Sequence, residues 1–144
     1  MYRRSNKDQL KIEDFFLPFG GKLDANNRWI KLAKITPWDK IEEFYLETMS
    51  EETGRKAISA RIAFGAVSIW KSEGISDEDV IRYIQENPYV QYYLGLHEFH
   101  TEPLFDSSMM VHFRKRFPVE FIAKVNECIC TGKWPEEKIG RAHV

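Results

Sequence analysis

The sequence predicts an all-α protein, and three observations support that fold class. Apolar residues recur at spacings of three and four in several segments, which is the spacing of one helix face. These segments begin near Ser, Thr or Asp and end at Gly or before Pro, the residues that start and stop helices. No segment alternates apolar and polar residues well enough to predict a strand. Because 43% of the 144 residues are hydrophobic and 14% aromatic, we expect a compact multi-helix domain.

Residues 1–35 are predicted to form an irregular N-terminal arm. The run from Phe15 to Phe19 is apolar, but Pro18 and a glycine pair interrupt it, so we expect it to pack as an extended segment. The first clear helix is predicted to follow from residue 36. Its start carries Thr36 as a cap and Pro37 at a position that suits the first helical turn.

The second helix is predicted over residues 59–73, with Gly74 as its C-terminal cap. Its residues are apolar nearly all round, so it should occupy the centre of the domain. Ser76 is expected to cap a third helix that stops before Pro88, where a short fourth helix begins. The two helices of residues 75–96 resemble a helix-turn-helix unit, although helical hairpins are common.

Two more helices are predicted, over residues 107–117 and 118–130. The domain is therefore expected to cover residues 36–130, followed by a linker and tail over residues 131–144. The helix of residues 107–117 has two unlike sides, because its Met and Phe residues gather opposite its polar residues. Hydroxyl groups and a histidine lie toward its N-terminal end, and a basic cluster lies at its C-terminal end.

A helix that enters the major groove of DNA needs such a face, with short polar groups for base edges and cations for phosphates. The formal net charge of the chain is only -1, so a nucleic-acid surface would have to be a local patch. We predict phosphate contacts from the basic cluster and groove contacts from the polar residues of this helix, namely Arg114, Lys115, Arg116, Ser107, Ser108 and His112. The alternative is a solvated face with cations placed favourably for the helix dipole.

Other kinds of site have little support in the sequence. His97, His100, Cys128 and Cys130 do not have the spacing of a recognised zinc site, and the cysteine pair fits a reducing cytosol. The acidic residues fall at helix starts or on polar faces, so no catalytic constellation can be assembled from them. No signal peptide or membrane-spanning stretch is apparent. We expect no catalytic residue, no metal ligand, no small-molecule substrate and no membrane partner.

Four blocks of sequence resemble the N-terminal domain of insertion-sequence-five-like transposases, the InsH type. The blocks are residues 60–66 (ARIAFGA), 74–79 (GISDED), 84–96 (IQENPYVQYYLGL) and 105–116 (FDSSMMVHFRKR), and the similarity extends over about residues 10–130. The resemblance implies a bacterial, cytoplasmic, nucleoid-associated protein that recognises terminal inverted repeats. In that family a separate RNase-H-like domain carries the DDE carboxylates and the divalent metal. We therefore expect no cofactor and no strand-transfer chemistry in this chain.

Two further interpretations remain open at this point. The domain could instead mediate self-association or dock on a catalytic domain, with anchors among Tyr89, Tyr92, Tyr93, Phe99 and residues 15–19. The exposure of these aromatic side chains distinguishes an assembly surface from a structural role, since buried rings only fill the core. Residues 139–144 (IGRAHV) resemble a translated sequencing adapter, so we expect a chain truncated before its catalytic domain.

Overall fold

The computed structural model describes residues 11–48 and 58–135. They form a short 3₁₀ helix and seven α-helices: η1 (Ile12–Asp14), α1 (Arg28–Ile35), α2 (Trp38–Thr48), α3 (Ala60–Glu73), α4 (Asp77–Glu86), α5 (Pro88–Tyr93), α6 (Met109–Arg116) and α7 (Val119–Thr131). Within this part of the chain the extended pairing is one isolated bridge between Phe16 and Glu98. The predicted all-α fold class is confirmed.

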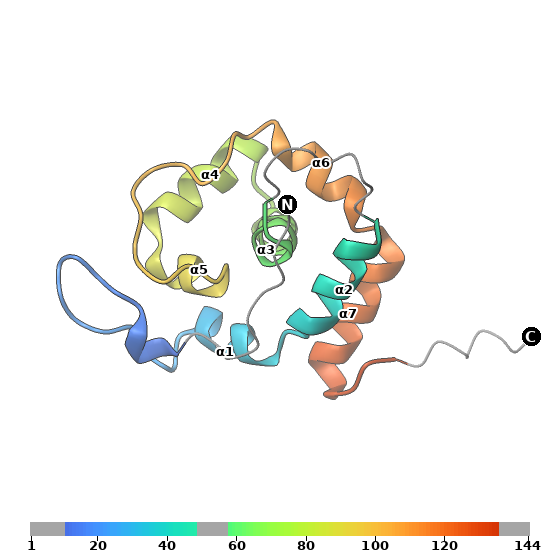
Figure 1. Ribbon diagram of the computed structural model, residues 1–144, viewed down its shortest axis with the longest axis horizontal. Helices are drawn as coiled ribbons and strands as arrows, with labels where there is room; N and C mark the ends of the chain where they lie inside the picture. Colours follow the sequence, from blue (N-terminus) through green and yellow to red (C-terminus); the bar gives the residue numbers. More distant parts are fainter. Residues whose placement is uncertain (1–10, 49–57, 136–144) are drawn as a thin grey trace, which may run out of the picture.

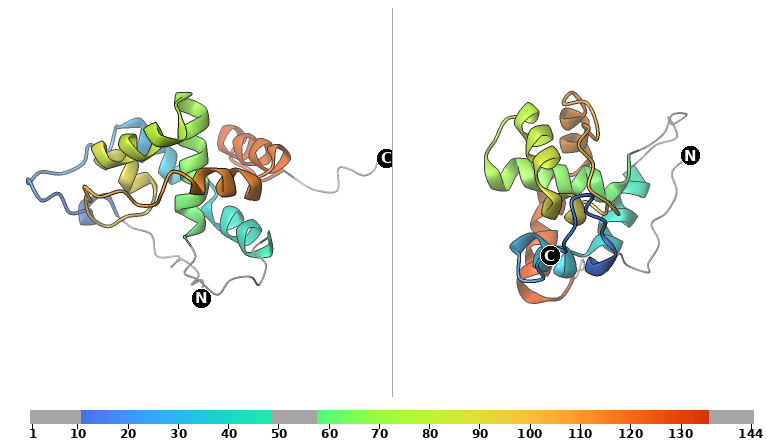
Figure 2. Two further views of the ribbon diagram at one scale, coloured as in Figure 1. Left: turned by 90° about the horizontal axis from the view of Figure 1, so that it is seen from above. Right: turned by 90° about the vertical axis from the view of Figure 1, so that its left-hand side faces the viewer.

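Helix α3 is the central element, as its apolar composition predicts. Ser59 caps it by accepting a hydrogen bond from the Ile62 N–H at 3.1 Å, and Gly74 ends it with φ of 63°. The other helices surround α3, which is seen end-on in Figure 1 and upright in the left view of Figure 2. At Gly65 a Cβ would overlap the buried side chain of Leu94, so the absence of a side chain lets α3 and the end of α5 approach closely.

Helices α4 and α5 meet at the break predicted at Pro88. The Asn87 side chain accepts hydrogen bonds from the N–H groups of Tyr89 and Val90, and Pro88 occupies the start of α5. Buried Gln91 then donates to the carbonyls of Ile84 and His100, and it accepts from the His100 N–H. These bonds fix the loop after α5 against α4. The likeness of the α4–α5 unit to a helix-turn-helix stays a prediction.

Helix α1 is a departure from the sequence prediction, which placed residues 28–35 in an irregular arm. Asn27 caps this helix by accepting a hydrogen bond from the Trp29 N–H at 2.8 Å. Trp29, Ile30 and Ala33 are buried on its inner side, next to α5. The short helix is therefore stabilised by tertiary packing, which a local propensity argument underestimates.

Two other predictions for the N-terminal part have different outcomes. Phe15 and Leu17 are buried in the core but Phe16 and Phe19 are exposed, so the prediction that this apolar run packs as an extended segment is confirmed in part. Thr36, predicted to cap the helix after it, instead donates its hydroxyl to the Leu32 carbonyl at 2.6 Å. It ends α1 rather than capping α2.

A cluster of aromatic rings fastens α6 and α7 to the rest of the domain. Phe117 lies between them and contacts the rings of Tyr45 and Phe64, with centroids 5.7 and 5.2 Å away. Phe121 stacks on Phe44 at 4.0 Å. Such ring pairs add to the free energy gained from burial alone. The predicted tail of residues 139–144 lies outside the described residues, and the predicted domain limits stay predictions.

Candidate nucleic-acid interface

Helix α6 is positioned by a turn at its start and by buried residues along its inner side. The Asp106 carboxylate accepts hydrogen bonds from the N–H of Ser108 at 3.0 Å and from its hydroxyl at 2.6 Å. These bonds, the one from the hydroxyl first, hold the pKa of Asp106 below its usual value. Met110 and Phe113 are buried, and the Phe105 ring packs on Phe113. The outer side of α6 is therefore held in a fixed orientation.

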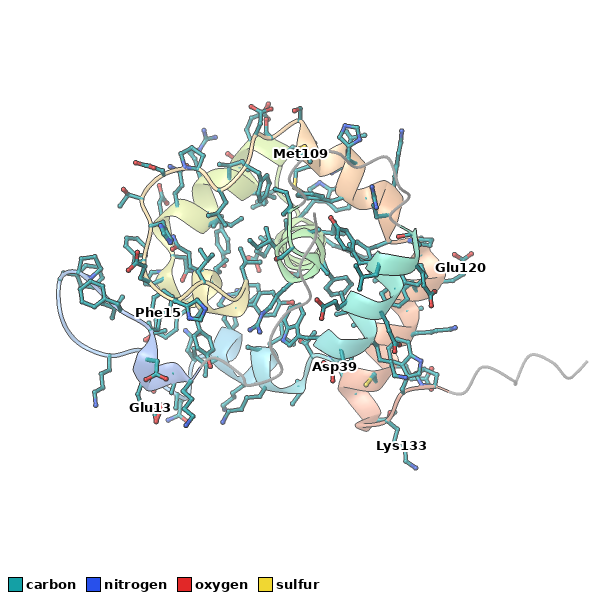
Figure 3. All side chains as sticks on the ribbon, viewed as in Figure 1. Glu13, Phe15, Asp39, Met109, Glu120 and Lys133 are labelled. Atoms are coloured by element: carbon teal, nitrogen blue, oxygen red, sulfur yellow. The ribbon has the colours of Figure 1, made fainter. Side chains whose placement is uncertain are left out.

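Four exposed residues make up that outer side, at positions that share one helix face: Ser108, Val111, His112 and Lys115. We refer to these four as the α6 face. The labelled Met109 marks the start of α6 in Figure 3, where the helix lies at the edge of the molecule. Three of the four were predicted from the sequence. Val111, which is 42% exposed, was missed, although its place three residues after Ser108 could have identified it.

Arg114 was predicted to contact phosphates, but its guanidinium is already engaged within the fold. It donates to both carboxylate oxygens of Asp77, at 2.8 and 3.2 Å, and lies 4.5 Å from the Trp70 ring centroid. The hydrogen bonds to Asp77 raise the pKa of Arg114. Arg114 thus joins α6 to the start of α4 and to α3.

Arg116 and Ser107 also lie away from the α6 face. The Arg116 guanidinium sits over the Tyr45 ring, 5.4 Å from its centroid. One of its nitrogens, Nη1, is buried and has no hydrogen-bond partner among the described residues. Ser107 is half-buried at the start of the helix. Of the six predicted residues, the structure brings three together on an exposed surface.

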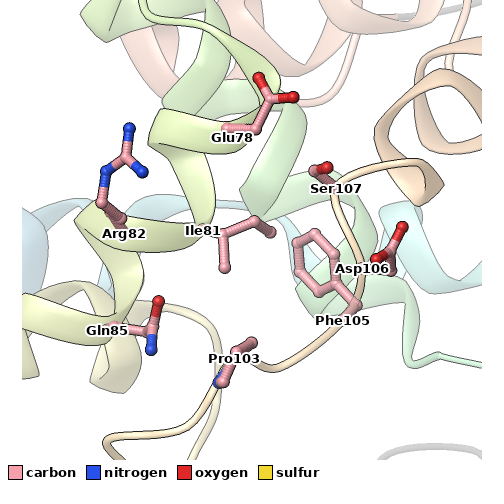
Figure 4. A pocket seen from close by; sticks show the side chains of 8 residues that line it. All are labelled: Glu78, Ile81, Arg82, Gln85, Pro103, Phe105, Asp106 and Ser107. Carbon is pink, nitrogen blue, oxygen red and sulfur yellow. The ribbon is translucent and has the colours of Figure 1, made fainter.

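Ser107 also belongs to an open pocket of about 540 Å³ between α4 and the loop before α6, drawn in Figure 4. Ile81 and Phe105 give the pocket an apolar part. Glu78 and Asp106 are exposed carboxylates on its lining. The N-terminal end of the α6 face therefore has acidic neighbours, and a phosphate would be attracted to the Lys115 end.

Among the described residues, no three His, Cys, Asp or Glu side chains gather as a metal ion would require. Cys128 and Cys130 are free thiols. None of the helices in residues 11–48 and 58–135 has the length and apolar character needed to cross a membrane.

Comparisons with known proteins bear on the same segment. The family described as "Transposase domain (DUF772)" matches residues 18–116. A relative from Rhizobium meliloti, described as "Uncharacterized protein ORF8 in nfe locus", is 29% identical over 135 residues. That alignment covers 88% of this chain and 65% of the relative, so the chain spans less than two thirds of the relative's length. No solved structure matches.

Proposed function

Because the chain belongs to the transposase domain family DUF772, we propose that it is the DNA-binding N-terminal part of an insertion-sequence transposase. In this proposal it recognises the terminal inverted repeats of its element, in the bacterial cytoplasm at the nucleoid. The observation that carries the proposal is the α6 face, where hydroxyl, imidazole, methyl and ammonium groups are exposed along one side of a firmly packed helix.

The residues of the α6 face match the two tasks of DNA recognition. Ser108 and His112 are short enough to place a donor or acceptor beside base edges in a major groove. Lys115, about one turn beyond His112 and two turns beyond Ser108, supplies a cation for the adjacent phosphates. Arg114 supports this surface by holding the helix to Asp77, while Arg116 supports it from the Tyr45 side.

The chemistry of strand cleavage and transfer is assigned to another part of the parent protein. The relative from Rhizobium meliloti extends beyond the segment aligned here. We therefore propose that residues 1–144 bind DNA and hold no catalytic residue, and that the divalent metal works in a separate catalytic domain.

The test is a binding measurement with fluorescent duplexes that carry the inverted repeats of the encoding element. The variant S108A/H112A/K115A should bind such a duplex at least about tenfold more weakly than the unaltered chain, because base and phosphate contacts are both removed. Lys133→Ala is the matched control, since Lys133 is exposed and lies after α7. The proposal fails if the unaltered chain has no affinity for this DNA at low salt.

A second candidate function is protein assembly, and one observation favours it. Phe16 and Phe19 are 58% and 69% exposed in the loop between η1 and α1, which projects from the helical body in Figure 1. Phe19 also packs edge-on against the half-buried Phe99, with centroids 6.0 Å apart. Tyr92 and Tyr93 are buried in the core, so they no longer serve as candidate anchors.

Light scattering distinguishes this candidate from DNA binding. If the exposed phenylalanines mediate assembly, the unaltered chain should form a dimer that the variant F16S/F19S does not form. The same variant should bind inverted-repeat DNA through the α6 face with unchanged affinity per chain. A chain that stays monomeric at high concentration would remove self-association from consideration.

A further inference from the structure

Helix α1 carries a row of cations that has no part in the α6 face. Arg28, Lys31 and Lys34 follow one another at intervals of three residues and are all exposed. The buried residues Trp29, Ile30 and Ala33 occupy the other side of the helix. Residues at intervals of three share a helix side, so the three cations form one outward row. We refer to Arg28, Lys31 and Lys34 as the α1 row.

The local charge of this segment is unlike that of the whole chain. The chain has 21 basic and 22 acidic residues, yet residues 25–38 contain the α1 row and no acidic residue. Among the described residues, one carboxylate reaches the row, since Glu73 at the end of α3 pairs with Arg28 at 3.1 Å. Lys31 and Lys34 are the members that give the row its positive charge toward solvent.

We propose that the α1 row is a second DNA-contacting surface, which binds the phosphate backbone of duplex DNA without reading its sequence. This inference rests on the proposed DNA-binding function and adds a separate surface to it. Successive cations in the row are about 4.5 Å apart along the helix axis, and flexible side chains at that interval can reach neighbouring phosphates of one strand.

The composition of the row favours DNA over a protein partner. A protein interface is built on apolar and aromatic residues and is depleted of charge at its centre. The outer side of α1 offers one exposed apolar residue, Ile35, among the cations. The DNA backbone needs only positive charge, and α1 places three cations together on one exposed helix side.

The position of α1 makes the row separable from the α6 face by experiment. The two helices lie on different sides of α3 in Figure 1. A substitution in one surface therefore leaves the residues of the other in place. Arg28 is unsuitable as a test position, because it also holds Glu73 and lies over the Trp29 ring.

The experiment measures binding of the full 144-residue chain to a mixed-sequence duplex that lacks the inverted repeats, over a range of NaCl concentrations. The variant K31Q/K34Q should lose affinity by on the order of tenfold or more at ~0.1 M salt. The slope of log affinity against log salt should fall by about 2, one for each lysine that contacts a phosphate. K31R/K34R keeps both charges and should bind as the unaltered chain does.

The matched control is K71Q/K133Q, which removes two exposed lysines from other elements. It should change the affinity and the salt slope little, and the urea midpoints of both double variants should equal that of the unaltered chain. Equal losses in K31Q/K34Q and K71Q/K133Q would mean that only net charge matters, which overturns the proposal. Unchanged binding by K31Q/K34Q, with weaker inverted-repeat binding by S108A/H112A/K115A, overturns the α1 row and leaves the proposed function standing. Failure of the unaltered chain to bind either duplex overturns both.

Discussion

Helices α1 and α6 are both eight residues long and both carry three cations, yet they use them differently. In α1 the cations are three residues apart and share one exposed side. In α6 the cations are consecutive, so their side chains leave the helix about 100° apart from one another. Arg114 turns toward Asp77 and Trp70, Arg116 turns toward Tyr45, and Lys115 between them is exposed.

The comparison shows that cations adjacent in sequence need not form a basic surface. A helix with one buried side directs some of any three consecutive residues toward its neighbours, and arginine suits such places because its guanidinium stacks on rings and pairs with carboxylates. The conspicuous run of residues 114–116 therefore yields one exposed cation. The inconspicuous spacing of α1 yields a continuous row.

If α1 and α6 are fastened equally well on their inner sides, removing a buried ring from either side should give the largest loss of stability. Trp29→Ala and Phe117→Ala should each lower the free energy of unfolding by about 3–5 kcal/mol, since each removes a buried ring packed among other rings. Urea unfolding followed by circular dichroism measures both. The milder Trp29→Phe and Phe117→Leu supply values if the alanine variants are already unfolded. A loss of less than about 1 kcal/mol in the free energy of unfolding for Trp29→Ala would mean that α1 is loosely held and that the two helices are not fastened alike.

A smaller difference in stability should distinguish substitutions at the neighbouring cations of α6. Arg114→Met should cost about 1–2 kcal/mol, the sum of a partly exposed ion pair and a ring contact. Lys115→Met should change stability by less than about 0.5 kcal/mol, because Lys115 is exposed. A double-mutant cycle of Arg114→Met with Asp77→Asn isolates the pair, and Glu78→Gln serves as the neighbouring control. Equal costs for the two cations would show that neither the Asp77 pair nor the Trp70 contact stabilises the fold.

Local chemistry explains which parts of the fold were predictable. The limits of α3 and the start of α4 follow from Ser59, Gly74 and Ser76, whose capping roles depend on a few neighbouring residues. Helix α1 was not predicted, because it is short and is held by Trp29 against Tyr93, 64 positions later in the chain. No local pattern reveals a contact of that separation.

The candidate site likewise has a part that local sequence predicts and a part that depends on tertiary packing. The sequence located the α6 helix, and helical spacing alone places Ser108, His112 and Lys115 together. It could not show that Arg114 is paired, because Asp77 is 37 residues away and the pairing depends on how α4 and α6 pack. The sequence predicts which groups a helix carries, while tertiary packing decides which of them remain exposed.

The smallest expected effect concerns how the two helices begin, and it depends on pH. Helix α1 is capped by the neutral amide of Asn27, whereas the turn before α6 uses the Asp106 carboxylate. Hydrogen bonds from Ser108 hold the pKa of Asp106 below its value in the unfolded chain, so folding favours the charged form. The stability that Asp106 contributes is therefore present above the unfolded pKa, about 3.9, and is lost as the pH falls through the lower folded pKa.

Unfolding measured between pH 7 and pH 2.5 tests this difference. The gap in stability between the unaltered chain and Asp106→Ala should be constant at neutral pH and should shrink below about pH 4. The gap for Asn27→Ala should not change through that range on account of the cap, because an amide does not titrate there. Glu102→Ala, at an exposed position in the same loop, is the control for added charge effects. An Asp106 carboxyl that titrates at or above about 3.9 by NMR would show that the Ser108 hydrogen bonds do not favour its charged form, and the two helices would then begin alike in their response to acid.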